Sequence, residues 1–179
     1  MGTPELTNGI LYLVLALALA IAIYTDLRHQ RLPNILTASA AVCGLAFQGW
    51  YLGLSGLGIA LGGFGVGLIA FLPFYVKGGM GAGDVKLMAA AGTFLGVKLT
   101  LIAVAYTLIA GGVCGLAYAA WRGGAWPMLQ RYLTTLHFLA VTGTVSHRGP
   151  QPGEVAAQRF PYAVPIAIGT LSALMWPVF

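Results

Sequence analysis

Long uncharged, mostly apolar runs alternate with short charged segments along this chain. No Asp, Glu, Lys or Arg occurs in residues 6–25, 32–76, 99–121 or 160–179, which are runs of 20, 45, 23 and 20 residues. A helix crosses a bilayer with about 20 apolar residues, so each run is long enough. Continuous apolar runs are typical of membrane helices, whereas the strands of a membrane β-barrel alternate apolar and polar positions. The pattern predicts an all-α integral membrane protein.

The lengths of these runs predict a polytopic bundle of six transmembrane helices. The 45-residue run exceeds two single spans, and Gly53-Leu54-Ser55-Gly56 has the composition of a turn in its middle. A glycine-rich loop then precedes Asp84, and the helix after it is short, about 21 Å at 1.5 Å per residue. The expected helices cover residues 9–25, 33–52, 55–76, 84–97, 99–121 and 161–178, within a single membrane domain of residues 1–179.

A cytoplasmic segment is expected between the fifth and sixth helices, over residues 122–160. Residues 127–141 carry leucines at helical spacing among polar side chains. This pattern predicts an interfacial amphipathic helix that lies on the membrane. Residues 146–158 are rich in Gly, Pro and polar residues and predict a loop.

Charge is scarce and predicts the orientation. Only 7% of residues are charged, against about 25% in soluble domains. The nine Lys and Arg residues are scattered singly rather than in a patch, so we expect no nucleic-acid partner. If the connection between the first and second helices lies in the cytoplasm, Lys98 is the single basic residue on the outer side of the membrane. This orientation places eight basic residues inside, namely Arg28, Arg31, Lys77, Lys86, Arg122, Arg131, Arg148 and Arg159.

Metal and disulfide chemistry are not expected. Cys43 and Cys114 both lie in apolar runs and are predicted to be small buried apolar residues. The three histidines do not have the HExxH spacing of a zinc site. We therefore predict no metal and no cofactor.

Two aspartates are the most informative residues. The four acidic residues are Glu5, Asp26, Asp84 and Glu154. Asp26 is expected to end the first helix and Asp84 to open the fourth, and two crossings between them return the chain to one face. Ionisable groups at the membrane boundary are costly and usually functional. The structural alternatives are a topological anchor at either position and helix N-terminal capping by Asp84.

Residues around Asp84 favour a functional site. Gly81 and Gly83 permit positive φ and close backbone approach, as a substrate-binding loop requires. Lys86 could bind lipid phosphate or bias the charge of Asp84, and both interpretations stay open. Two carboxylates within a few Å share one proton, so one acts as a base on water while the other polarises the scissile carbonyl. Asp26 and Asp84 are therefore predicted to be catalytic.

Three segments resemble a known family at this point. Thr25-Asp26 followed by Arg31-Leu32-Pro33-Asn34, then residues 81–87 (GAGDVKL), resemble the signature segments of the type IV prepilin peptidases. These are GxGD aspartic proteases of the bacterial membrane. Residues 160–169 are similar to their C-terminal segment. The resemblance covers about residues 20 to 175.

The resemblance implies an endopeptidase that removes the basic leader from prepilins and pseudopilins after a glycine. It implies a bacterial inner membrane location, with the active site facing the cytoplasm. Long members carry an N-terminal domain with paired CxxC motifs and also act as methyltransferases. This chain resembles the short form of the Flp (tight adherence) pilus systems, so methyltransferase activity is not expected.

Other functions remain as alternatives. A presenilin-like GxGD protease of other substrates should show a Pro-Ala-Leu motif, which the chain lacks. A small transporter would need acidic or polar groups deeper in the membrane, and we expect none in the apolar runs. A non-catalytic scaffold of a secretion system would not need glycines before Asp84. Pairs of glycines four residues apart predict helix packing within the chain or, alternatively, a homodimer seam; they are Gly58 and Gly62, Gly63 and Gly67, and Gly111 and Gly115.

Overall fold

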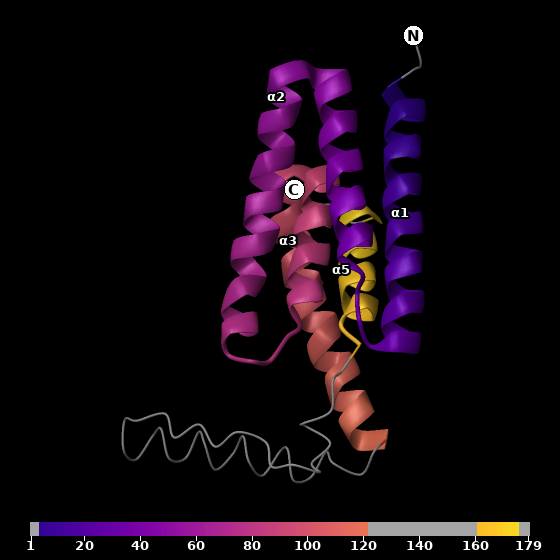
Figure 1. Cartoon of the computed structure of the whole chain (residues 1–179), viewed down its shortest axis with the longest axis vertical. Helices are drawn as coiled ribbons and strands as arrows, with labels where there is room; N and C mark the ends of the chain where they lie inside the picture. The colour runs from indigo at the N-terminus through magenta and orange to yellow at the C-terminus, as the bar shows by residue number, and fades with distance from the viewer. Residues whose placement is uncertain (1–3, 122–160, 176–179) are drawn as a thin grey trace, which may run out of the picture. The chain divides into compact units, whose positions relative to one another are not determined.

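A computed structural model describes residues 4–121 and 161–175, and these residues form helices joined by short connections (Figure 1). The helices are α1 Pro4–His29, α2 Asn34–Val76, α3 Ala82–Trp121 and α5 Ala163–Met175. The helical fold class predicted from the sequence is confirmed for this part of the chain. The predicted amphipathic helix at 127–141 and the rest of the segment 122–160 lie outside the described residues.

The chain divides into two compact units. The first is Met1–Gly111 with Pro161–Phe179, and the second is Gly112–Phe160. Of the second unit, the structure describes only the end of α3. The first unit contains both aspartates and is called the bundle below.

The apolar character of the helices fits a membrane protein. α1, α2 and α3 each contain a stretch long and apolar enough to cross a membrane, and α5 is a shorter apolar helix. Many large apolar side chains on α1 and α2 are exposed, including Leu13, Leu17, Val42 and Ile69. The two cysteines are less buried than predicted, since Cys43 is exposed and Cys114 is intermediate. In a membrane helix, small apolar residues can face lipid instead of the protein interior.

α1 is longer than the sequence analysis predicts. It runs over Pro4–His29 instead of residues 9–25, so Asp26 lies inside the last turn and does not end the helix. Arg28 and His29 suit that turn because basic side chains are favoured near the negative end of the helix dipole. Gln30 ends the helix with a left-handed backbone (φ 50°), and its N–H donates to the Asp26 carbonyl at 2.8 Å.

One glycine interrupts each of the two longest helices. Gly53 has φ 61° and ψ −142° and lies where the sequence predicts a turn. Gly96 has φ 71° and ψ −179°, one residue before the expected end of the fourth helix. Glycine adopts a positive φ at little cost, because it has no Cβ. Each break divides its helix into two limbs, and α2 folds back on itself so that both its ends lie at the same end of the bundle (Figure 1).

The first limb of α3, residues 82–95, lies at the centre of the packing. Between Asp84 and Gly96 every residue except Lys86 is buried. Both limbs of α2 press small residues against it, because a Cβ on Gly44 would collide with the Thr93 side chain and one on Gly67 would lie 2.6 Å from the Met88 carbonyl oxygen. This limb is short but packs among longer helices, so its length does not have to match the bilayer.

Two glycines bring α2 and α3 into backbone contact. A Cβ on Gly63 would collide with the Gly92 carbonyl, and a Cβ on Gly92 would collide with the Gly63 carbonyl. The predicted role of small residues in packing within the chain therefore holds for Gly63, and for Gly67 as described above. Gly58 and Gly115 have nothing within 4 Å of an added Cβ, so their use in a homodimer seam stays a prediction.

Polar side chains do occur inside the apolar runs, and the expectation of none is wrong. Gln48 donates from Nε2 to the Phe94 carbonyl at 3.3 Å, close to the break at Gly96. Thr100 and Thr107, in the run 99–121, and Thr93, just before it, are buried and donate to carbonyls of their own helix at 2.6–2.7 Å. Such groups need partners in an apolar interior, and these bonds supply them. These side chains form hydrogen bonds with backbone carbonyls. Because none of them is acidic, they do not form the proton relay of a transporter.

Gly63→Ala tests the backbone contact at the centre of the bundle. The added Cβ forces α2 and α3 apart, and overpacking of this kind costs about 1–3 kcal/mol. We expect a lower midpoint of thermal unfolding in detergent, measured by circular dichroism. The matched control is Gly65→Ala on the same limb, where nothing lies within 4 Å of the new Cβ. Equal midpoints for the two variants would contradict the predicted contact.

Candidate active site

Asp26 projects from the last turn of α1 and is 7% exposed. Its Oδ2 accepts a hydrogen bond from the backbone N–H of Ala163 at 3.1 Å. Ala163 is the first residue of α5, whose first-turn N–H groups have no acceptor within the helix. A side chain near the end of one helix therefore caps the beginning of another.

Asp84 lies in the first turn of α3 and is also 7% exposed. Its Oδ2 accepts a hydrogen bond from the Gly81 N–H at 3.0 Å. This is the acidic half of a capping box, in which the third helical residue reaches back to the residue before the helix. The predicted capping role of Asp84 is thus present in the structure. Capping does not preclude catalysis, because the carboxylate has a second oxygen.

The two glycines before Asp84 have packing roles that differ from the reason given in the sequence analysis. A Cβ on Gly81 would lie 3.0 Å from Asp84 Oδ2, and a Cβ on Gly83 would lie 2.8 Å from Leu32 Cβ. Neither glycine has a positive φ. Both are needed for close approach, and their role toward a substrate stays a prediction.

Two contacts tie the beginning of α3 to the connection between α1 and α2. Gly83 packs against Leu32, and Lys86 Nζ donates to Asn34 Oδ1 at 2.9 Å. Leu32 follows Asp26 by six residues, and Gly83 directly precedes Asp84. The end of α1 and the beginnings of α3 and α5 lie at one end of the bundle (Figure 1), so both carboxylates are at this end.

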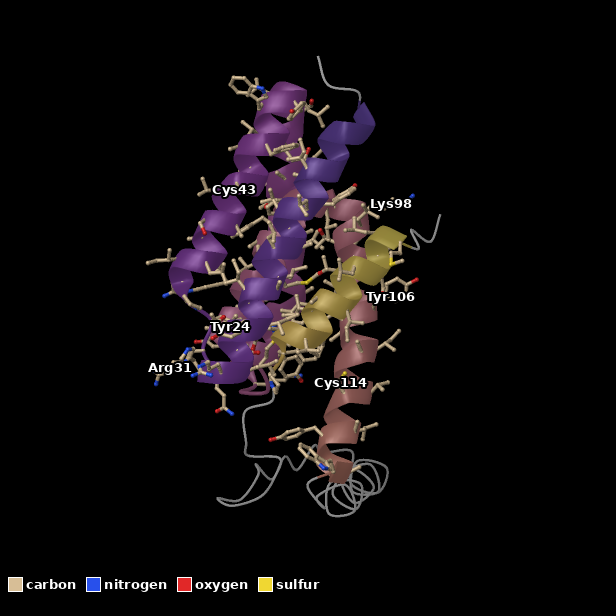
Figure 2. The ribbon with its side chains drawn as sticks, turned by 90° about the vertical axis from the view of Figure 1, so that its right-hand side faces the viewer. Tyr24, Arg31, Cys43, Lys98, Tyr106 and Cys114 are labelled. Atoms are coloured by element: carbon tan, nitrogen blue, oxygen red, sulfur yellow. The ribbon has the colours of Figure 1, made fainter. Side chains whose placement is uncertain are left out.

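Basic side chains are unevenly placed along the bundle. Figure 2 shows Arg31 at the end where α1 stops, whereas Lys98 lies well away from it along the bundle axis. In the sequence analysis, Lys98 is the single basic residue predicted to lie on the outer side of the membrane.

A shallow hollow lies beside the Lys86–Asn34 hydrogen bond. Its volume is about 280 Å³, and it is lined by Asn34, Thr37, Ala38, Ala41, Phe64 and Lys86. The walls come from both limbs of α2 and from the beginning of α3. The hollow therefore combines apolar walls with a single cation at its edge.

Sequence reasoning found the two carboxylates and the capping role of Asp84 but not the partner of Asp26. Ala163, which binds Asp26, and Leu32 and Asn34, which contact the beginning of α3, all belong to segments that the sequence analysis singled out, at residues 160–169 and 31–34. A helix start after Pro161 indicates unpaired N–H groups there. No local signal indicates that Asp26 is their acceptor, since the two residues are 137 positions apart.

Comparison with known proteins identifies the family. The model of the type IV leader peptidase family matches residues 13–116, a segment that contains both Asp26 and Asp84. The chain belongs to the type IV leader peptidase family. This membership confirms the resemblance noted from the two aspartate segments.

One curated relative in this peptidase family is the prepilin leader peptidase/N-methyltransferase of Bacillus subtilis (strain 168). It is 31% identical over 121 residues, which is 63% of this chain and 45% of the relative. The aligned part is thus less than half of that protein's length. No solved structure gives a significant match.

No group of three or more His, Cys, Asp or Glu residues that could hold a metal occurs within residues 4–121 and 161–175. That the chain needs no metal and no cofactor stays a prediction.

Gly83→Val tests the contact that holds the Asp84 loop. A valine side chain cannot fit where Leu32 Cβ is 2.8 Å from the Cβ position, so the loop and its aspartate must move. If Asp84 is catalytic, as the sequence predicts, a small displacement is costly, and we expect cleavage to fall at least about tenfold. Cleavage of a co-expressed prepilin is the measurement. Gly79→Val is the control, since the nearest atom to its Cβ is a carbonyl oxygen at 3.6 Å. Normal cleavage by the Gly83 variant would show that this contact does not position the site.

Proposed function

We propose that this protein is a membrane aspartic endopeptidase that removes the basic leader from prepilin-like substrates at the cytoplasmic face, after a glycine. Membership of the leader peptidase family supports leader cleavage in general. The observation that carries the catalytic assignment is the pair of buried carboxylates at one end of the bundle. Each of them is bound by a backbone N–H at the beginning of a helix.

The chemistry of such a pair follows from its charge. The proposed mechanism requires the two carboxylates to come within a few Å of each other, where repulsion between their charges makes them share one proton. The two helix N-termini favour negative charge, so one member of the pair stays ionised. This arrangement suits one group to accept a proton and the other to donate one.

Hydrolysis then proceeds without a covalent enzyme intermediate. The ionised carboxylate takes a proton from a water molecule, and the water oxygen attacks the carbonyl carbon of the scissile bond. The protonated carboxylate donates its proton to the carbonyl oxygen. When the tetrahedral intermediate collapses, the C–N bond breaks and the amine leaves with the proton that the first carboxylate took from water. The second carboxylate takes back a proton from a hydroxyl of the intermediate, which forms the product carboxyl group and restores the pair. We assign these duties to Asp26 and Asp84 jointly.

Six membrane crossings fit the helices best. α2 has 43 residues, about 65 Å of helix, against a hydrocarbon core of about 30 Å. Its break at Gly53 therefore separates two crossings, and the break at Gly96 does the same in α3. With α1 and α5, this gives six crossings. The excess of Lys and Arg on one side supports a cytoplasmic position for the end that carries both carboxylates.

The proposal is confined to peptidase activity in the inner membrane of a bacterium. The relative named above also carries N-methyltransferase in its name, but it aligns over only 45% of its length. A carboxylate pair supplies acid–base chemistry and no methyl donor. The leader peptide, with its basic residues held at the cytoplasmic surface, is the partner that this site requires.

Substitution of either aspartate tests the catalytic assignment. Asp26→Asn and Asp84→Asn each remove one proton-exchanging group, and loss of a general acid or base costs about 100-fold or more. We expect both variants to reach the membrane and to leave a co-expressed prepilin uncut, as judged by its mobility on a gel. Glu154→Gln, outside both aspartate segments, is the control and should cleave normally. Retained cleavage in either aspartate variant would refute joint duty.

The residue before the cut in the substrate tests the predicted specificity. We expect an extended substrate backbone to lie close to the loop at Gly81 and Gly83, an approach that leaves room only for a small residue before the cut. Replacement of the pre-cleavage glycine by leucine is expected to block processing, whereas replacement of one leader lysine by glutamine only slows it. The two substrates are compared in the same membrane preparation. Efficient cutting of the leucine substrate would disprove the small-residue requirement.

A further inference from the structure

The hydrogen bond between Asp26 and Ala163 joins the first and last described helices. Asp26 is 7% exposed, and Ala163 is fully buried. Their contact is a backbone N–H donating to carboxylate Oδ2 at 3.1 Å. Hydrogen bonds to charged acceptors are stronger than neutral ones, and burial strengthens them further. This bond therefore restricts the orientation of the Asp26 carboxylate.

The beginning of α5 has few N–H groups that could fill this role. Pro165, in the first turn, has no N–H, and the Ile166 N–H donates to the Tyr162 carbonyl at 3.1 Å. Only the Ala163 and Val164 N–H groups remain in that turn without a helical acceptor. The beginning of α5 thus offers N–H groups that have no acceptor within the helix, and Asp26 accepts a hydrogen bond from one of them.

α5 itself is fixed by contacts elsewhere. Gly169 packs against α3, where a Cβ would lie 2.7 Å from the Thr107 Cα. Near the beginning of α5, Tyr162 and Pro165 are in van der Waals contact with the Cβ position of Gly111. α5 also packs along α1. With the helix held at both positions, the Ala163 N–H is a fixed point toward which the carboxylate must turn.

We infer that α5 is a positioning element for catalysis, and that the Ala163 N–H sets the orientation of Asp26. This inference rests on the proposed catalytic role of Asp26. The N–H does not touch substrate and acts only through the carboxylate. Its loss should therefore lower kcat, because the base or acid is misdirected, while KM changes little, because substrate contacts are intact.

The test removes this one donor. Proline at the first position of a helix is compatible with the helical backbone, so Ala163→Pro deletes the N–H while keeping the helix start. Ala163→Val adds comparable bulk at the same buried position and retains the N–H. With a purified prepilin in detergent, we expect Ala163→Pro to lower kcat by about 10- to 100-fold, corresponding to one hydrogen bond to a charged group. Ala163→Val shares the added bulk but keeps the N–H, so its loss in kcat should be clearly smaller than that of Ala163→Pro, and KM should change less than about threefold in both variants.

Three outcomes overturn the inference. They are a wild-type kcat for Ala163→Pro, an equal loss in both variants, and a loss seen mainly in KM. If Ala163→Pro does not fold, the 162–163 amide is replaced by an ester, using the α-hydroxy acid analogue of alanine, which removes the N–H without adding bulk. A wild-type kcat for the ester protein overturns the inference as well.

Asp26→Asn in the same assay separates the two hypotheses. If Asp26→Asn cleaves normally, the proposed function itself fails. If Asp26→Asn is inactive while Ala163→Pro or the ester protein cleaves normally, only the positioning role of α5 fails.

Discussion

A carboxylate buried at the end of an apolar bundle requires hydrogen-bond donors, and this requirement organises the site. Helix N-termini are the nearest source, because their first N–H groups have no partner within the helix. Asp84 uses the beginning of its own helix, and Asp26 uses the beginning of α5. The Asp26 contact also joins the end of α1 to the beginning of α5, whereas the Asp84 contact lies within the beginning of α3. Stability and placement of the carboxylates therefore depend on one kind of interaction.

The second constraint is the close approach of backbones around the first limb of α3. Without a strong hydrophobic force between helices in lipid, association depends on tight packing. Gly63 and Gly92 allow that packing at mid-helix, and Gly83 allows it at the beginning, against Leu32. Among the described glycines, two separate uses are therefore seen. Gly53 and Gly96 turn the backbone, and Gly63, Gly83 and Gly92 let neighbouring segments touch.

The sequence predicts the parts of this structure that depend on local signals. Run lengths and the composition around Gly53 indicate the helices and their main turn, and the glycine-rich loop indicates that Asp84 lies near a helix start. The position of Asp26 inside the last turn of α1 is missed, because the helix continues through charged residues that were expected to end it. The overlooked Gln48 is a similar case, since its partner is a carbonyl near a break on another helix.

Pairings between distant segments could not be predicted at all. Nothing near Asp26 indicates Ala163, and nothing near Gly83 indicates Leu32, because each contact exists only after the helices have assembled. The sequence does mark both partner segments through the family resemblance. It marks them as belonging to the site without indicating which atoms meet.

The Asp26–Ala163 bond also has a consequence for biosynthesis. A ribosome makes α1 early and α5 late, with 137 positions between the two partners. During that interval Asp26 lacks the N–H of the last helix, whatever the state of α1, α2 and α3. The arrangement of the carboxylate described here is complete only when α5 has been made and has packed against α1. Docking of α5 is thus the step in which the Asp26 carboxylate acquires this hydrogen bond, and a chain terminated before Ala163 lacks it.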